Sequence, residues 1–292
     1  MISKIFFSVV AISLFLGLAL DAATIDEEQA GKVDFSYKNG SNGPSNWGKL
    51  KPEFSACSSG KNQSPVNILK NDTVYNKNLT PLSKNYTAFA NATLINWGFI
   101  IGLHYNGDIG GMEINGKKYA FKQLHWHSPS EHLIDGQRYD AEMHLVHEAE
   151  DRSVAVSAIL YQYGDTTKDV DPFLAKLNHG LEKLSKEKCE KDQVSQIPVG
   201  MLSTKHITRS TRKYYRYVGS FTTPPCTENV IWTVLSKARS ISKEQVAALK
   251  APLTADFKDN ARPEQELNGR QIELYDELKY KGGLLTKRKE PV

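Results

Sequence analysis

The sequence predicts a single, mainly-β domain that spans residues 31–280. Strand-like segments dominate the chain, only two helices are convincing, and the alternating strand–helix order of a parallel α/β sheet is missing. The 292 residues suffice for one large domain with a sizeable core. The apolar content of 40% and charged content of 24% exclude general disorder and collagen-like structure.

Two functional classes are excluded by charge and hydropathy. The net charge of +4 is spread along the chain and predicts no nucleic-acid partner. The only long apolar run, residues 5–20, is shorter than the roughly 18 residues of a membrane-spanning helix, so no membrane span is expected. Lys4 before the run and small residues after it are typical of a signal peptide over 1–23, cleaved near Ala22–Ala23. We therefore expect a secreted protein, outside the cell or, through the secretory route, in a plastid.

The expected elements follow in chain order. Residues 31–65 are rich in Gly, Asn, Ser and Pro, which predicts a loop-rich lead-in. Short strands are expected between 92 and 165, and further strands follow the first helix. The most strand-like segments are 118–127, 154–163, 214–218 and 230–235.

Two helices are predicted by their first residues. Asp171-Pro172 opens a segment with apolar side chains on one helical face. Ser242 opens the second segment, and Gln245 completes a capping box there. The basic tail 281–292 is expected to fray.

The three cysteines have to be interpreted for an oxidising compartment, where one disulfide and one leftover thiol are the simplest arrangement. Cys189 lies in a highly charged run that is a poor place to bury a bridge, so we expect Cys57 to pair with Cys226. Six Asn-x-Ser/Thr sequons also suit a glycosylated secreted protein. They begin at Asn39, Asn62, Asn71, Asn78, Asn85 and Asn91.

The candidate functional residues lie in a histidine-rich stretch. His125 and His127 are two residues apart, so on a strand both imidazoles point to one face. His144 can join them if its segment pairs antiparallel with theirs. Gln123 and Glu142 each precede a histidine by two residues and could accept its second N–H. Three neutral imidazoles with an open fourth position are typical of catalytic zinc.

Two other interpretations remain open at this point. The histidines could be hydrogen-bonded strand residues without a metal. Cupin sites also combine His-x-His with a nearby Glu, here Glu131, and a further His. A cupin would imply oxidation chemistry or a seed-type storage protein.

The remaining motifs carry a resemblance to one family. They are Gln123–His132, Tyr139–His147, Gly219–Glu228, Gln63–Val66 and Asn260–Pro263. In order and spacing, from about Phe35 to Gln271, they resemble the α-class carbonic anhydrases, and most of all the secreted plant members, which include tuber storage and nectar proteins. The resemblance implies one domain around a large, mostly antiparallel central sheet with a few peripheral helices.

The resemblance also implies a zinc enzyme that hydrates CO2 to bicarbonate. His125, His127 and His144 would bind Zn2+, which lowers the pKa of its bound water to about 7, and the hydroxide attacks CO2. Thr222 would donate its hydroxyl proton to Glu131, because an ionised carboxylate only accepts. The Thr222 oxygen would then accept from the hydroxide and orient it.

Further roles are implied around the zinc. Gln123 and Glu142 would support the ligands, and Asn260 would offer its backbone carbonyl to His127. Thr223 and the Thr222 N–H would contact bicarbonate. Tyr37 would line the pocket wall, while His132 and His147 would be structural. The CO2 pocket would be formed by Val146, Val156, Phe221 and Trp232. The Cys57–Cys226 pair also matches the disulfide of secreted members.

The chain departs from the family pattern at one position. Phe99 follows Asn96-Trp97-Gly98, where the family places its proton-shuttle histidine. Phenylalanine carries no proton, so impaired proton shuttling is expected. His104 lies five residues on, and odd spacing in a regular strand turns it to the opposite face unless a glycine marks a bulge. The alternative function is a secreted storage or binding protein on this fold with weak or no hydration activity.

Overall fold

The computed structural model describes residues 34–280, except 167–168, 188–193 and 209–211. The expected signal peptide, Cys189 and the basic tail lie outside the described residues. No helix in the described ranges is long and apolar enough to cross a membrane.

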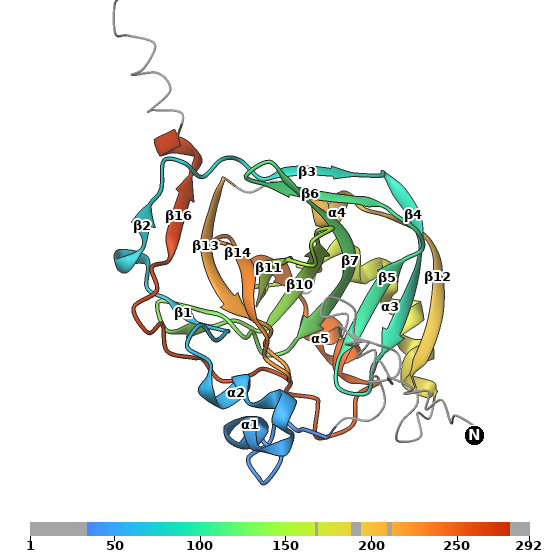
Figure 1. Cartoon of the computed structure of the whole chain (residues 1–292). Coiled ribbons are helices and arrows are strands. Elements are labelled where there is room, and N and C mark those ends of the chain that lie inside the picture. The colour runs from blue at the N-terminus through green and yellow to red at the C-terminus, as the bar shows by residue number, and fades with distance from the viewer. Residues whose placement is uncertain (1–33, 167–168, 188–193, 209–211, 281–292) are drawn as a thin grey trace, which may run out of the picture.

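A sheet of thirteen strands forms the centre of the described structure (Figure 1). Its main path runs, in spatial order, through β12 (Ser195–Ser203), β4 (Phe89–Asn96), β5 (Ile101–Tyr105), β7 (Lys117–His127), β10 (Ala141–Glu148), β11 (Val154–Tyr163), β14 (Glu228–Leu235), β13 (Lys213–Ser220), β16 (Glu273–Asp276) and β2 (Val74–Tyr75). Three more strands join its sides, namely β3 (Ser83–Tyr86), β6 (Gly110–Ile114) and β15 (Arg239–Ile241). A separate small sheet contains β1 (Asn67–Ile68), β8 (Leu133–Ile134) and β9 (Gln137–Arg138).

The prediction of a mainly-β fold is confirmed. Most neighbouring strands of the large sheet are antiparallel, but β11 pairs parallel with β14 and β15, and β16 pairs parallel with β2. All eight residues of β10 and the first eight of β11 are buried. These strands are therefore covered on both faces, which is why their sequences do not alternate between apolar and polar residues.

Two longer helices cover one face of this sheet. Helix α3 (Pro172–Lys186) begins where the Asp171 carboxylate accepts from two backbone N–H groups, each at 2.9 Å. Helix α5 (Lys243–Lys250) begins at the predicted capping box of Ser242 and Gln245. The Gln245 side chain also exchanges two hydrogen bonds with the Asp171 backbone, both at 2.8 Å. The starts of the two helices are thus tied together.

The two faces of the central strands have different roles. Met143 and Leu145 of β10 pack with Leu124 and Trp126 of β7 into the core under α3 and α5. Residues that alternate with them point to the opposite face. That opposite face carries all the histidines of the predicted site.

Some elements were not predicted. The lead-in contains short helical turns, namely η1 (Pro44–Asn46), α1 (Trp47–Leu50), η2 (Pro52–Phe54) and α2 (Ala56–Ser59), and two more short turns occur at η3 (Lys70–Asp72) and α4 (Lys205–Thr208). Strand β12 was also missed. It contains Pro198 and Gly200, and the ladder register shifts between them. An edge strand tolerates such a bulge, but Pro198 and Gly200 interrupt the strand-like pattern of the sequence, so the strand was not predicted.

Candidate metal centre

Strand register brings the predicted site residues together. The antiparallel pairing of β7 and β10 places His125 opposite His144 and His127 opposite Glu142. Directly opposed residues on neighbouring strands share a face of the sheet. The three histidines and Glu142 therefore lie side by side on the sheet face opposite α3 and α5.

The three imidazoles converge on one point. One ring nitrogen from each lies within 4.8 Å of the other two, and His125 Nε2 is 3.2 Å from His144 Nδ1. His127 and His144 are buried, and His125 is partly buried. Burial lowers the pKa of His127 to about 4 and also lowers the pKa of the other two. All three rings are therefore neutral near pH 7.

The outer nitrogen of each ring meets a hydrogen-bond acceptor. These contacts are Gln123 Oε1 with His125 Nδ1 at 2.8 Å, the Asn260 carbonyl with His127 Nδ1 at 2.7 Å, and Glu142 Oε1 with His144 Nε2 at 2.7 Å. A neutral imidazole has one N–H, and an acceptor outside each ring places it there. The inner nitrogens consequently present lone pairs to one another.

Such an arrangement fits a cation. Lone pairs 3.2 Å apart cannot hydrogen-bond to each other, and His127 Nε2 is buried without a hydrogen-bond partner among the described residues. A buried set of unpaired acceptors is costly unless a positive group satisfies it. Three imidazoles are the protein-supplied donor set typical of catalytic zinc, whose fourth position is left to water or substrate.

Glu131 lies beside this cluster. Its Oε1 accepts from the Arg262 backbone N–H at 2.9 Å, and its Oε2 is 3.4 Å from His127 Nε2 without a hydrogen-bond partner in the described structure. Burial raises the pKa of Glu131 to about 7, although the hydrogen bond of the nearby Thr222 hydroxyl opposes this increase. Glu131 is not part of the ligand group whose atoms all lie within 4.8 Å of one another. The geometry thus favours three histidine ligands over the cupin arrangement.

Glu142 organises the buried side of the site. Its carboxylate accepts from the backbone N–H groups of Glu131 and His132, both at 2.8 Å, from His132 Nδ1 at 2.6 Å and from His144 Nε2. Burial alone would raise its pKa, but His132 and His144 hold the pKa well below its usual range. Glu142 therefore stays ionised and fixes the orientation of His144.

The hydrogen bonds continue beyond Glu142. His132 Nε2 lies 2.6 Å from the Tyr217 hydroxyl, which lies 2.9 Å from Ser64 Oγ. The group of His132, Glu142 and His144 also has metal-ligand spacing, but these contacts already occupy its donor and acceptor atoms. It is therefore a hydrogen-bond relay and not a second metal site. Tyr217 was not singled out from the sequence, where it is one of several strand tyrosines.

The residues expected to line an apolar CO2 pocket form one row across the sheet. Val146 lies opposite Val156, and Val156 lies beside Trp232 on the parallel strand β14. The Trp232 ring centroid is 4.8 Å from that of His144, so this row adjoins the histidines. Phe221 is partly buried against the same cluster. Thr222 is buried and Thr223 partly buried in the loop before β14.

The proton-transfer region differs from the expectation. Phe99 lies in the turn between β4 and β5, is 7% exposed, and packs edge-on against Phe35 with ring centroids 5.3 Å apart. His104 shares a face with Gly102, which lies opposite His125. The orientation expected for a regular strand therefore does not apply, because Phe99 lies in a turn that contains Gly98 at a φ of 88°, and a glycine irregularity was the exception that the sequence left open.

Trp97 intervenes between His104 and the histidine cluster. Its ring packs against His104 with centroids 5.4 Å apart. It also covers Gly102 so closely that a Cβ there would lie 1.9 Å from the ring. Only glycine at position 102 allows this packing.

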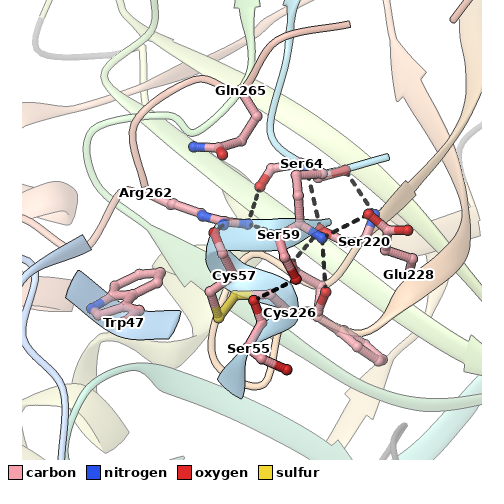
Figure 2. The surroundings of a disulfide bond; sticks show 12 residues. Trp47, Ser55, Cys57, Ser59, Ser64, Ser220, Cys226, Glu228, Arg262 and Gln265 are labelled. Atoms are coloured by element: carbon pink, nitrogen blue, oxygen red, sulfur yellow. Dashed lines mark hydrogen bonds between the residues drawn. A yellow bond between two sulfur atoms is a disulfide. The ribbon is translucent and has the colours of Figure 1, made fainter. Parts of the chain in front are cut away.

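The predicted disulfide between Cys57 and Cys226 is confirmed (Figure 2). Beside it, the buried Arg262 guanidinium donates to the backbone carbonyls of Cys57 and Ser64 at 3.0 and 2.8 Å. The backbone N–H of Arg262 donates to Glu131. The disulfide region and the metal centre are thus joined through one residue.

Comparisons with known proteins agree with this geometry. The profile of the eukaryotic-type carbonic anhydrase family matches residues 42–276. The chain is 41% identical to alpha carbonic anhydrase 7 of Arabidopsis thaliana over 94% of this chain and 96% of that protein. It is 40% identical to dioscorin DB3L of Dioscorea polystachya over 96% and 98% of the two chains. A crystal structure of dioscorin complexed with ascorbate superposes with a TM-score of 0.79 at 38% identity, covering 85% of this chain and all of that one.

Proposed function

The chain belongs to the eukaryotic-type, or alpha, carbonic anhydrase family, and from that premise we propose that it is a secreted zinc enzyme interconverting CO2 and bicarbonate. The observation that carries the proposal is a set of three imidazoles whose inner nitrogens converge on one point. The outer N–H of each ring donates to an acceptor, namely Gln123, the Asn260 carbonyl or Glu142. Zinc in such a site lowers the pKa of water to about 7 and so supplies hydroxide near neutral pH.

The residues around the histidines have separate tasks in this proposal. Glu131, in its ionised form, accepts a hydrogen bond from the Thr222 hydroxyl, and the Thr222 oxygen then accepts one from the nucleophile and orients it. The row of Val146, Val156 and Trp232 offers CO2 a buried apolar surface, which suits a substrate without charge. Thr223 and the Thr222 N–H hold the bicarbonate product.

A storage or binding role on the same fold is the second candidate. The similarity to dioscorin and the presence of Phe99 at the shuttle position favour it. Both candidates can bind zinc, so metal content alone does not separate them. The rate of CO2 hydration does.

Stopped-flow CO2 hydration with and without a zinc chelator tests the proposal. We expect activity that the chelator removes, zinc restores and a sulfonamide inhibits, since its anionic nitrogen takes the open zinc position. His144→Ala should lose both metal and activity, whereas His179→Ala, at an exposed position on α3, should retain both. Stoichiometric iron or manganese would instead support the cupin chemistry, and zinc without hydration would support the storage role.

A further inference from the structure

A second pocket lies beside the relay residue Tyr217, which contributes to its wall. It has a volume of about 510 Å³ and lies beside β13 and β16. That volume is within the range of small-molecule sites. Arg216 lines this pocket and, as the neighbour of Tyr217 on β13, points to the opposite face of the strand.

Arg216 carries a buried charge, on which the charge of Glu273 acts favourably without a direct ion pair. The residue is 7% exposed, and its guanidinium forms no hydrogen bond or ion pair with any described residue. The guanidinium carbon lies 5.2 Å from the centroid of the Tyr214 ring, in a cation–π contact. Arginine stays protonated even when burial lowers its pKa, as it does here. A buried cation without a hydrogen-bonded counter-ion is unfavourable, so an anion that reached the guanidinium would stabilise this site.

The neighbouring acid, Glu273, supplies a nearby negative charge but no hydrogen bond to the guanidinium. Glu273 lies opposite Arg216 in the β13–β16 register, but its Oε1 accepts from Asn76 Nδ2 at 2.6 Å. On the other side, Thr233 of β14 lies opposite Arg216, and its buried hydroxyl has no hydrogen-bond partner among the described residues. Thr233 does not line the pocket, so the Arg216 guanidinium is the group that a ligand there would meet.

We propose that this pocket binds a small organic carboxylate through Arg216. A carboxylate matches the paired N–H groups of a guanidinium. The negative charge of Glu273 in the pocket wall repels a dianion such as phosphate more strongly than it repels a monocarboxylate. The amides of Asn78 and Asn115 and the apolar side chains of the pocket can hold the remainder of the ligand. This site is independent of the zinc chemistry proposed above.

Calorimetric titration tests the proposal with sodium lactate, glycolate and gluconate against sodium chloride and phosphate at equal ionic strength. The protein carries Thr80→Ala, which removes the sequon that begins at Asn78 in the pocket wall. We expect at least one of the three carboxylates to bind once per chain at this pocket. Arg216→Gln should weaken that binding at least tenfold. Arg212→Gln, which makes the same charge change at an exposed site, should leave it unchanged.

A second variant protects the test against misfolding of Arg216→Gln. Asn115→Asp places a carboxylate in the exposed pocket wall, at a left-handed turn position that Asp tolerates, and should also weaken binding about tenfold. Anions bound at the histidine cluster would be insensitive to both substitutions. The proposal is overturned if no carboxylate binds more tightly than chloride, if both variants bind like the parent, or if phosphate binds most tightly.

Discussion

Phe99 is the residue that most affects the expected turnover. Its ring belongs to an aromatic cluster with Phe35, Tyr37 and Trp47, so no group that titrates near neutral pH occupies this position. Each catalytic cycle must export a proton from the active site, and a group with a pKa near 6.5 suits that transfer. Proton export is therefore the step that Phe99 affects, while nucleophilic attack depends on other residues.

We predict that kcat is limited by proton export. In wild-type protein kcat should rise with the concentration of an imidazole buffer, and Phe99→His should raise kcat in dilute buffer with kcat/KM nearly unchanged. Phe99→Leu is the control, because it disturbs the same packing without adding a titratable group. If wild-type turnover is fast and indifferent to buffer, another group exports the proton, and His104→Ala is the first variant to examine.

Glu142 is predicted to be a positioning residue for the metal. Glu142→Gln weakens the acceptor that fixes His144 Nε2–H, so zinc affinity should fall about 10- to 100-fold. Competition with a chromophoric chelator measures this change. Glu148→Gln is the matched control, because Glu148 is buried on the same strand but contacts Lys122 and Arg152. Equal zinc affinity in wild type and Glu142→Gln would contradict the assigned role.

At the scale of elements, strand β10 carries a buried histidine outside the metal centre. His147 is fully buried, its Nδ1 faces the Ala155 carbonyl at 3.3 Å, and its Nε2 lies 2.6 Å from the Tyr86 hydroxyl. Burial, and next the charge of Lys84, lower the pKa of His147 to about 3. The unfolded chain therefore takes up this proton at a higher pH than the folded protein.

The sign of the resulting pH dependence follows from linkage. The contribution of His147 to stability is fully present above pH 6.5 and is lost as the pH falls toward 3. Between pH 7 and 5 the loss should be about 2 kcal/mol in the free energy of unfolding. His125, His127 and His144 also have lowered pKa values, so every variant should lose stability as the pH falls. In urea unfolding the loss should be about 2 kcal/mol smaller in His147→Gln than in wild type and in the exposed-site variant His179→Gln. An identical pH slope in all three proteins would contradict it.

The disulfide joins elements that are distant in sequence. Cys57 in α2 and Cys226 before β14 are separated by 169 residues. Closing so long a loop in the unfolded chain stabilises the fold by about 5 kcal/mol in the chain-entropy model, an upper value. The double variant Cys57→Ser, Cys226→Ser should therefore unfold at a lower urea concentration, with a loss of several kcal/mol. Unchanged stability would show that the loop ends are held by other contacts, such as those of Arg262.

The elements that the sequence predicted well are those with strong local signals. The Pro172 and Ser242 helix starts and strand β11 lie where they were expected, because capping and dense β-branched residues act locally. The pairing of β7 with β10 was anticipated only from histidine spacing. Short elements such as β16, and the place of His104, depend on partners and turns elsewhere in the chain, which no local pattern records.

At the scale of the whole molecule, one sheet serves two purposes through its two faces. Helices α3 and α5 seal one face of the central strands (Figure 1). The three histidines occupy the other face. The candidate ligands come from two adjacent strands, so the rigidity of the sheet sets their spacing. The outer acceptors on Gln123, Glu142 and Asn260 then set their orientation.

The most direct test is the rate of CO2 hydration by protein whose zinc content has been measured. The account predicts one zinc per chain and hydration well above the buffer rate, lost on chelation, restored by zinc, and absent from His144→Ala. Imidazole buffer is included at high concentration, so that slow proton export does not mask the reaction. Protein that holds one zinc per chain and yet hydrates CO2 no faster than buffer would contradict the account and leave the storage role.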